Sequence, residues 1–395
     1  DKSAVCYIQN VYRGPGLKGV PEGVVDSLRV FTYAYGYYNT GNHHHIGIES
    51  GWDVKRMLGT VKVEKDGSAM FRIPANTTIS IQPLDKEGRA LQLFRSWLVA
   101  MPGEELSCIG CHEPPTEPPV TSKTVASGKK PQDINPYRPR VEGFAFDMEV
   151  QPILDAYCVR CHDGSDPKKP DFKNKALLDT KKVEEHYSNS YHAFHRYFRR
   201  PGPESSGVMG IPYEYHASTS EGVQLLEKGH HGVKLDDDSW RRLYTWVDLN
   251  VPYYGSWTTV YSIDEKKESW TTNIAAHAAS LRAKYAGVES NWEYTPAAPY
   301  PVAVTKEKSE ELHAPVTVSA ANWPFSAEAA KQLQRQAGGE QKRVVDLGNG
   351  VSLTLVRVPA GEFVMGSDDE TAQEQPRHRV KIEKPFWISE SEINN

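Results

Sequence analysis

The sequence predicts a multidomain α+β protein: a β-rich domain, a mainly α domain, a linker, and the first strands of a further domain. Strand-like apolar alternation dominates the first 107 residues, helical spacing dominates residues 143–256, and strand-like alternation returns from Arg343. A chain of 395 residues, 38% of them hydrophobic, is long enough for two or three packed domains. We therefore expect these regions to fold as separate domains.

The β-rich region consists of short apolar runs that are separated by turn residues. Two hairpins are predicted: 61–63 with 69–73 around Asp66-Gly67, and 79–81 with 90–94 around Lys86-Glu87-Gly88. The stretch from 114 to about 140 is rich in proline, lysine and serine. This composition is typical of a linker.

The helical region begins with a proline that suits the first turn of a helix. Pro152 predicts a helix over 152–159, which delivers Cys158. Four residues then share the i, i+3, i+4, i+7 spacing of one packed helix face: Tyr191, Phe194, His195 and Phe198.

Two more helices are predicted from their ends. Ser218 and Glu221 form a capping-box pattern that opens a helix ending at Gly229. Asp237 or Asp238 caps the next helix, whose apolar face comprises Trp240, Leu243, Tyr244 and Val247. Beyond it, residues 258–342 are interpreted as a linker with one short helix over 326–336, and 351–358 as a strand.

Four of the five cysteines form two C-x-x-C pairs, each followed directly by histidine. The motifs are Cys108-Ile109-Gly110-Cys111-His112 and Cys158-Val159-Arg160-Cys161-His162. C-x-x-C-H is the attachment signature of c-type haem, in which both thiols bond the porphyrin and the histidine binds the iron. Chance would give one such motif in roughly one in several hundred comparable sequences. We therefore expect two haem c groups, with His112 and His162 as iron ligands.

Two alternatives to haem remain open. A zinc ribbon needs C-x-x-C pairs about 15–20 residues apart, whereas Cys111 and Cys158 are 47 positions apart. A thioredoxin-like redox pair is the other alternative, but the sequence around the cysteines does not show the βαβ pattern that such a pair would have. Cys6 is the remaining thiol, and we interpret it as a small buried apolar residue, with a metal or intersubunit role as the alternative.

Covalent haem is attached outside the cytoplasm, so we expect a periplasmic or other extracytoplasmic location. The net charge of −5 does not favour nucleic acid as a partner. No window approaches the roughly 18 apolar residues of a membrane span. The sequence begins with Asp1 and stops within a segment that has a structured pattern, so we expect it to be part of a longer protein. The absence of a signal peptide therefore carries no weight.

Residues 1–125 resemble the middle domain of the hydrazine synthase alpha subunit. The resemblance is carried by Leu58-Gly59-Thr60-Val61, Asp66-Gly67-Ser68-Ala69, 71–77, Gln82-Pro83-Leu84-Asp85, Arg95-Ser96-Trp97, Met101-Pro102-Gly103-Glu104 and 107–113. Residues 145–256 resemble the C-terminal cytochrome c domain of that family, through 150–154, Cys158 to His162, Lys228-Gly229-His230-His231 and 245–250. The resemblance implies a multihaem c-type redox protein, and it does not imply hydrazine synthesis.

The tail is similar to the start of a formylglycine-generating enzyme (sulfatase-modifying factor) domain, through 359–367, 375–380 and 390–394. The catalytic and metal residues of that domain lie later, so no active site is carried over. The expected organisation is a β-rich first haem domain at 1–125, a linker at 126–142, a cytochrome c-like domain at 143–257, a linker with a short helix at 258–342, and a truncated formylglycine-generating-enzyme-like domain at 343–395.

The distal ligand of the second haem is expected to be His231, then His230, then Met209. The helix stop at Gly229 frees the two histidines from the helix. A Met ligand would raise the reduction potential of the haem, whereas ligation by two imidazoles would lower it. His192 and His195 suit a packed aromatic face, and His216 is a weaker candidate.

For the first haem, His112 is the only histidine between Cys108 and the second motif. In the family it resembles, the corresponding histidine turns to zinc and a later Tyr binds iron. No Tyr stands at 113–116, and zinc stays an alternative at His112. The alternative ligands for the iron of the first haem are His43, His44 and His45, which we otherwise interpret as a solvated loop. Arg95 suits a haem propionate, and Asp53 is a salt-bridge partner or a metal ligand.

The expected function is electron transfer by a dihaem c-type cytochrome, with redox catalysis on a small molecule at the first haem as an extension. The partner is then a redox protein or a small-molecule substrate. One alternative is a formylglycine-generating-type enzyme with accessory haem domains, and another is a zinc-binding structural module. Whether the chain is an enzyme, which would make it a haem-dependent oxidoreductase, stays open.

Overall fold

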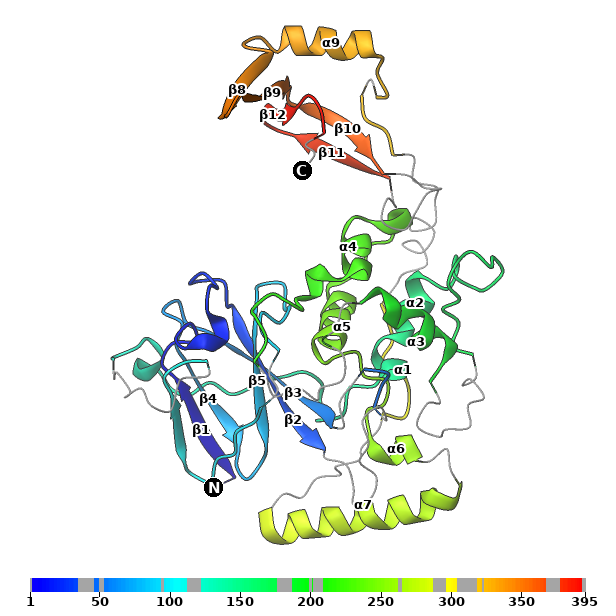
Figure 1. Ribbon diagram of the computed structural model, residues 1–395. Helices are drawn as coiled ribbons and strands as arrows, with labels where there is room; N and C mark the ends of the chain where they lie inside the picture. The colour runs from blue at the N-terminus through cyan, green and yellow to red at the C-terminus, as the bar shows by residue number, and fades with distance from the viewer. Residues whose placement is uncertain are drawn as a thin grey trace. The chain divides into compact units, whose positions relative to one another are not determined.

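Figure 1 shows the computed structural model of the chain. It describes residues 2–34, 46–49, 53–93, 96–111, 122–175, 187–198, 201, 209–261, 265–286, 296–303, 318–321, 323–366 and 377–392. The chain divides into two compact units, Asp1–Gln224 with Leu235–Ser309, and Leu225–Lys234 with Glu310–Asn395. The described residues form a mixed α+β protein, as predicted.

The β-rich part of the first unit consists of two sheets. One sheet has the order β4-β1-β6, with β4 (Ala69–Pro74) antiparallel and β6 (Glu105–Cys108) parallel to β1 (Ser3–Ile8). The other has the order β5-β2-β3-β7, from strands β5 (Ile79–Leu84), β2 (Ser27–Ala34), β3 (Val54–Lys62) and β7 (Asn135–Pro136). Buried residues of both sheets belong to one apolar cluster, including Cys6, Leu28, Val61, Phe71 and Ile81. The two sheets therefore share one core.

The turn at Asp66-Gly67 forms as predicted, but the hairpin does not. Gly67 N donates to Glu64 O at 2.8 Å and lies at φ 79°, which glycine adopts without a Cβ clash. The strands on either side then separate, because β3 pairs with β2 and β7, whereas β4 pairs with β1. The turn residues could be predicted locally, but the partner of each strand is decided by the shared core.

The second predicted turn is formed, although only one of its arms is a named strand. Asp85 N donates to Arg89 O at 3.0 Å and Leu91 N to Pro83 O at 2.9 Å, so the chain folds back on β5. The returning arm makes isolated bridges at Ala90 and Leu98.

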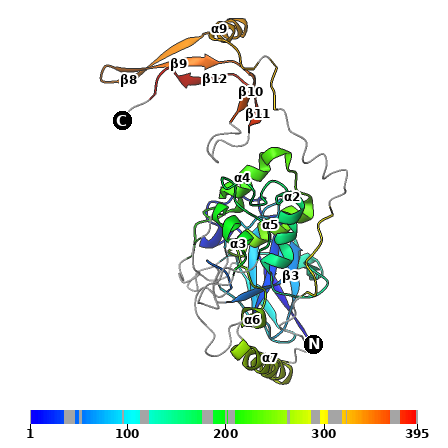
Figure 2. The same cartoon turned by 90° about the vertical axis from the view of Figure 1, so that its right-hand side faces the viewer.

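The helical part of the first unit contains α1 (Phe146–Glu149), α2 (Gln151–Tyr157), α3 (Asn189–Phe194), α5 (Asp237–Asp248), α6 (Trp257–Tyr261) and α7 (Glu265–Ala286). Figure 2 shows α2, α3 and α5 gathered together. Their common core is aromatic: Phe194 stacks on Trp246 at 5.5 Å, and Phe146 contacts Tyr191 at 5.2 Å. Tyr191, Phe194 and Phe198 are buried, as their spacing predicts.

Two helix starts differ from the sequence patterns. The cap of α5 is Asp236, whose side chain accepts a hydrogen bond from Ser239 N, one residue before the expected cap. Ser218 lies instead in the short 3-10 turn Ala217–Thr219, and α4 (Glu221–Glu227) begins three residues later. Its hydroxyl is already paired with His216 at 2.7 Å, so it does not cap α4.

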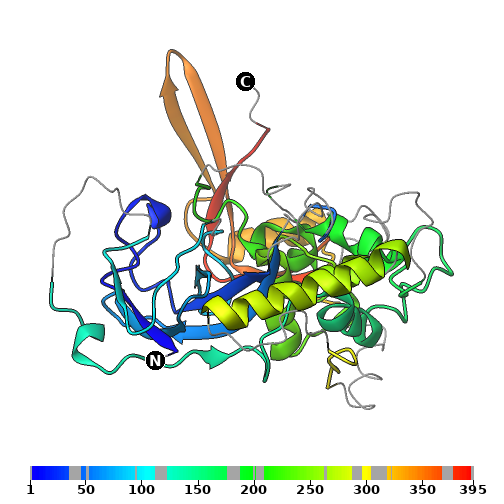
Figure 3. The same cartoon turned by 90° about the horizontal axis from the view of Figure 1, so that it is seen from below.

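The helix α7, seen from below in Figure 3, lies in a region interpreted as linker. Its 22 residues show no apolar stripe, and its described side chains are exposed or half-buried. Periodicity cannot reveal such a helix. In the part of the chain that the structure describes, no helix combines the length and apolarity needed to cross a membrane.

The β-rich and helical parts are joined by a buried polar contact. Arg29 on β2 donates to Asp248 at the end of α5 at 2.6 Å, and both side chains are almost fully buried. Gln82 also donates to the backbone oxygen of Asp248, at 3.0 Å. Residues of the expected linker 126–142 are tied to the sheets, since Gln132 bonds Met70 and Arg72 and β7 extends the second sheet.

The second unit contains α9 (Ala327–Gln336), which Ser326 caps at the position predicted for the short helix. Its sheet has the order β12-β9-β8, from β8 (Lys342–Gly348), β9 (Val351–Val358) and β12 (Phe386–Ser389). A separate pair joins β10 (Gly361–Met365) to β11 (His378–Ile382). The strand predicted over 351–358 is confirmed, while the resemblance of this unit to a formylglycine-generating enzyme stays a prediction.

Candidate haem-attachment sites

The first C-x-x-C motif begins at the last residue of β6 and is held by the loop that follows β1. Gln9 N donates to Cys108 O at 2.9 Å, and Asn10 N to Ile109 O at 3.1 Å. Cys111 N donates to Arg13 O at 2.8 Å, and Gly16 N returns a bond to Cys111 O. Residues 9–16 therefore fix the backbone of the motif from Cys108 to Cys111.

Two glycines permit this close approach. A Cβ added at Gly110 would lie 2.2 Å from the backbone oxygen of Arg13, and one at Gly16 would lie 2.4 Å from Cys111 Sγ. Both distances are shorter than real Cβ contacts. The glycine inside the motif thus has a structural reason that the C-x-x-C pattern alone does not give.

An open cavity lies beside both thiols of the first motif. Its empty volume is about 760 Å³, a figure that includes the open solvent at its mouth. Besides Gly110, Cys108 and Cys111, it is lined by apolar residues, Ile8, Val11, Leu17, Leu28, Ile81, Pro83 and Leu98. An apolar wall with two thiols at its edge fits a porphyrin that is bonded through its vinyl groups.

Cys6 lies next to this site. It is fully buried in the core cluster against which Cys108 and Cys111 pack. A hydrogen bond with the Cys108 thiol and burial both raise the pKa of Cys6 well above its usual value. The prediction that Cys6 is buried is confirmed. The structure also places Cys6 next to Cys108, which the sequence does not indicate.

The second motif follows the end of α2 and forms a tight turn. Cys158 N donates to Leu154 O at 2.8 Å, so it continues the last helical turn. The amides of Cys161 and His162 both point to Cys158 O, at 3.0 Å. Burial raises the pKa of the Cys158 thiol to about 12, whereas Cys161 is exposed.

The ring of His162 is oriented by the loop that follows it. Its Nδ1 lies 3.1 Å from Pro170 O, and the ring stacks on Phe172 at 4.7 Å. Phe172 N donates to His162 O and closes this loop. Because a ring nitrogen can donate to a carbonyl only when it carries the proton, this contact directs the lone pair to Nε2. Such an outer partner is the usual companion of a metal-binding histidine.

The expected distal histidines follow α4 in a 3-10 turn, His230–Gly232. Gly229 lies at φ 84°, which confirms the predicted helix stop. His231 is held at φ 45° and its ring packs edge-on against His230 at 4.5 Å. Both belong to the second unit and His162 to the first, so their pairing with the second haem stays a prediction.

Other histidines of the helical part have structural partners. His195 stacks on Tyr191 at 5.6 Å, and the ring of His192 lies 5.7 Å from Tyr187, in agreement with the expected aromatic packing. His216 is buried between Ser218 and Asp85, at 2.7 and 3.1 Å. Burial would raise the pKa of Asp85, but hydrogen bonds from His216 and Arg89 outweigh it and lower the pKa to about 2.

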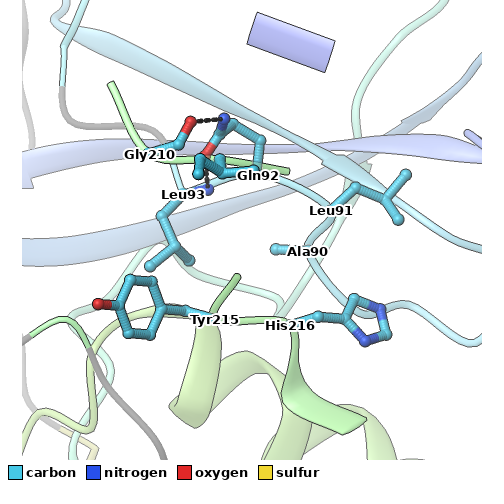
Figure 4. A pocket seen from close by; sticks show the side chains of 8 residues that line it. Ala90, Leu91, Gln92, Leu93, Gly210, Tyr215 and His216 are labelled. Carbon is cyan, nitrogen blue, oxygen red and sulfur yellow. Dashed lines mark hydrogen bonds between the residues drawn. The ribbon is translucent and has the colours of Figure 1, made fainter. Parts of the chain in front are cut away.

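Gln92 is a residue of this region that sequence reasoning missed. Its Nε2 donates to Gly16 O at 3.0 Å. It also donates to Gly210 O at 2.7 Å, as Figure 4 shows. Since Gly16 also bonds Cys111, the segment that carries Met209 is tied to the first motif. A small pocket beside Gln92 is lined by Leu91, Leu93, Tyr215 and His216 (Figure 4). Nothing in the local sequence marks Gln92, because its partners are distant in the chain.

Several expected site residues lie outside the described residues: His112, His43, His44, His45 and Arg95. Asp53 is half-buried directly before β3. Among the described residues, no group of three or more His, Cys, Asp or Glu side chains is arranged to hold a metal ion.

Two comparisons found similar proteins, a family model and a solved structure. Residues 23–113 match the family model of the hydrazine synthase alpha subunit middle domain. A solved structure of Kuenenia stuttgartiensis hydrazine synthase is similar with a TM-score of 0.47 and 17% identity, over 64% of this chain and 43% of that chain. No curated protein matches the sequence. From β2 to the end of the first motif, the chain is thus similar to the middle domain of the hydrazine synthase alpha subunit.

Proposed function

We propose that this chain is a c-type haem redox protein that holds one haem at Cys108 and Cys111 and another at Cys158 and Cys161. The observation that carries the proposal is the apolar cavity at the first motif, which has both motif thiols in its wall. The doubled C-x-x-C-H pattern and the similarity of residues 23–113 support it independently. Bound haem supplies one-electron transfer.

At the first site, the chain provides the thiols and a wall of apolar residues. Leu17 and Leu28 are each 1% exposed and lie on the cavity side of the core. Burying a flat apolar group against them is favourable by about 25 cal/mol per Å² of apolar surface. The loop over residues 9–16 holds the two thiols in place through backbone bonds, so the attachment points do not depend on side-chain packing alone.

At the second site, His162 offers Nε2 to the iron while Pro170 O holds Nδ1. Phe172 limits rotation of the ring by stacking on it. For the distal position we propose His231, then His230, because the left-handed backbone of His231 is a strained conformation that often marks functional residues. Met209 ranks below them, since its neighbour Gly210 is tied to Gln92 near the first motif.

Electron transfer is the role that this arrangement supports best. The two motifs lie in one compact unit, and the Arg29–Asp248 pair joins the parts that carry them. Redox catalysis on a small molecule at the first haem, an extracytoplasmic location and a redox partner protein belong to the same proposal. Haem attachment to both thiols requires a compartment with the attachment machinery.

The test is the intact mass of the full chain after expression with a c-type cytochrome maturation system. The unchanged protein should carry two haems. Cys108→Ala/Cys111→Ala and Cys158→Ala/Cys161→Ala should each carry one, at the motif left intact. Cys6→Ser is the matched control, because it removes a thiol that is not part of a motif and should keep both haems.

Acid–acetone extraction that removes the colour would contradict covalent attachment. A haem count that does not change in either double variant would contradict the assignment of the motifs. For the distal ligand, His231→Ala should abolish the low-spin bis-imidazole spectrum of the second haem. Spectra unchanged by substitution of both His231 and His230 would exclude this pair.

A further inference from the structure

A buried glutamine lies at the start of the helix that leads into the second motif. Gln151 is the first residue of α2, and Cys158 directly follows the end of that helix. The Gln151 side chain is 2% exposed. Its Nε2 donates to Phe172 O at 3.0 Å and to Asp155 Oδ1 at 2.8 Å, and its Oε1 accepts from Ser190 Oγ at 2.6 Å. These partners fix the orientation of the amide, since its nitrogen can only donate and its oxygen can only accept.

Phe172, which Gln151 holds, belongs to the loop that orients His162. Phe172 N donates to His162 O at 2.9 Å, and the two rings stack at 4.7 Å. Pro170 O, two residues earlier in the loop, lies 3.1 Å from His162 Nδ1. The hydrogen bond of Gln151 therefore acts on the same short segment that sets the direction of the imidazole ring.

The carbonyl between these two positions is held from α3. Asn189 Nδ2 donates to Asp171 O at 3.1 Å, and the next residue, Ser190, supplies the hydroxyl that Gln151 accepts. Three successive carbonyls of the loop thus have three different partners. Two of them are bound by side chains of α2 and α3, and the third, Pro170 O, faces the ring. Because its neighbours are bound, the Pro170 carbonyl has little freedom to turn away.

We propose that Gln151 is a positioning residue of the second haem site: it holds the loop 170–172 so that Pro170 O keeps the His162 proton on Nδ1 and leaves Nε2 for the iron. The inference rests on the haem function proposed above. A carbonyl that accepts from Nδ1 increases the basicity of the ligating nitrogen. A more basic ligand favours the oxidised iron, so the intact network should lower the reduction potential of this haem.

A purely structural role for Gln151 makes a different prediction. A buried amide that only ties α2 to α3 would stabilise the fold without acting on His162. Its loss would lower the free energy of unfolding and leave the ring unchanged. The reduction potential and the tautomer of His162 therefore distinguish positioning from simple anchoring.

The experiment compares the unchanged full chain with Gln151→Met after haem attachment. Methionine has a similar length, adds no charge and removes all three hydrogen bonds. At a fixed applied potential, the ratio of reduced to oxidised second haem should rise about three- to tenfold. A tenfold rise is a shift of about 59 mV for one electron. The first haem is the internal control, and its redox transition should not move.

Two further variants complete this measurement. The transition that is lost in Cys158→Ala/Cys161→Ala identifies the second haem. Gln224→Met is the matched control, because Gln224 is exposed on α4 and its amide donates to Ser218 O, so neither transition should move. Ser190→Ala removes one partner and keeps Gln151. It should shift the second haem in the same direction by about two- to threefold, and it carries the test if Gln151→Met does not fold.

The tautomer of His162 is a readout that does not need haem. Nitrogen NMR of the full chain, expressed without haem-attachment machinery, should show the form protonated at Nδ1, with its signal identified by its loss in His162→Gln. In Gln151→Met the two tautomers should mix.

An unchanged potential and an unchanged tautomer in both Gln151→Met and Ser190→Ala would overturn the proposal, whatever the loss of stability. If no haem attaches at Cys158 and Cys161, the proposed function fails there, and the tautomer alone decides the role of Gln151 in orienting His162. If both haems attach and only the stability changes, this inference fails and the proposed function stands.

Discussion

The two C-x-x-C-H motifs have the same spacing and very different surroundings. The first follows a strand, is clamped by residues 9–16, and borders an apolar cavity within a two-sheet core. The second follows a short helix, and its histidine is held by the carbonyl of Pro170 and the ring of Phe172. The motif thus predicts the same attachment chemistry at both places, while the surrounding fold decides how enclosed each proposed site is and which groups hold the motif.

The contact that joins the two regions gives the largest expected effect. Asp248→Ala leaves Arg29 charged and buried without its carboxylate, which should cost about 3–5 kcal/mol of unfolding free energy. Urea unfolding of the full chain measures this loss. Asp166→Ala is the control, because its pair with Lys169 is exposed and 3.9 Å long, and should change stability by about 0–1 kcal/mol. Equal effects for both variants would show that the buried pair does not stabilise the joined unit.

The third residue of each motif allows the two turns to be compared directly. In the first motif it packs against the loop over residues 9–16, and in the second it is exposed. Gly110→Ala places a Cβ 2.2 Å from the backbone oxygen of Arg13, so the clamp must shift. We expect a loss of about 1–3 kcal/mol and a lower occupancy of the first haem. Arg160→Ala, at the matching exposed position of the second motif, should stay within about 0.5 kcal/mol. The measurements are thermal unfolding and the haem content of each motif. If Gly110→Ala lowers neither, residues 9–16 do not hold the first motif tightly.

The smallest effect concerns pH and the contact of Asp85 with His216. Because its folded pKa of about 2 lies below the ordinary value, ionised Asp85 stabilises the fold above about pH 4. This contribution, up to about 2 kcal/mol, should be lost as the pH falls from about 4 to about 2. Asp85→Asn should therefore be less stable than the unchanged protein at neutral pH, and the difference should close in acid. A difference that does not vary with pH would contradict this account.

Local sequence signals predicted many elements of this fold. Pro152, Gly229 and Ser326 mark helix ends that the structure contains within a residue or two. The 66–67 and 86–88 turns also form. These features depend on backbone conformations and hydrogen bonds between near neighbours, which residue type controls directly. Helix α7 could not be predicted, because it has no apolar face to give a period.

The sequence by itself predicted the attachment chemistry, since two thiols and a histidine at this spacing are the signature of c-type haem. Only the tertiary structure decided that β3 and β4 part into different sheets, that Cys6 meets Cys108, and that Gln92 connects Gly16 with Gly210. These contacts join residues far apart in the chain. They form because burying a common core outweighs the entropy of closing long loops, and no local pattern records which partners that core will bring together.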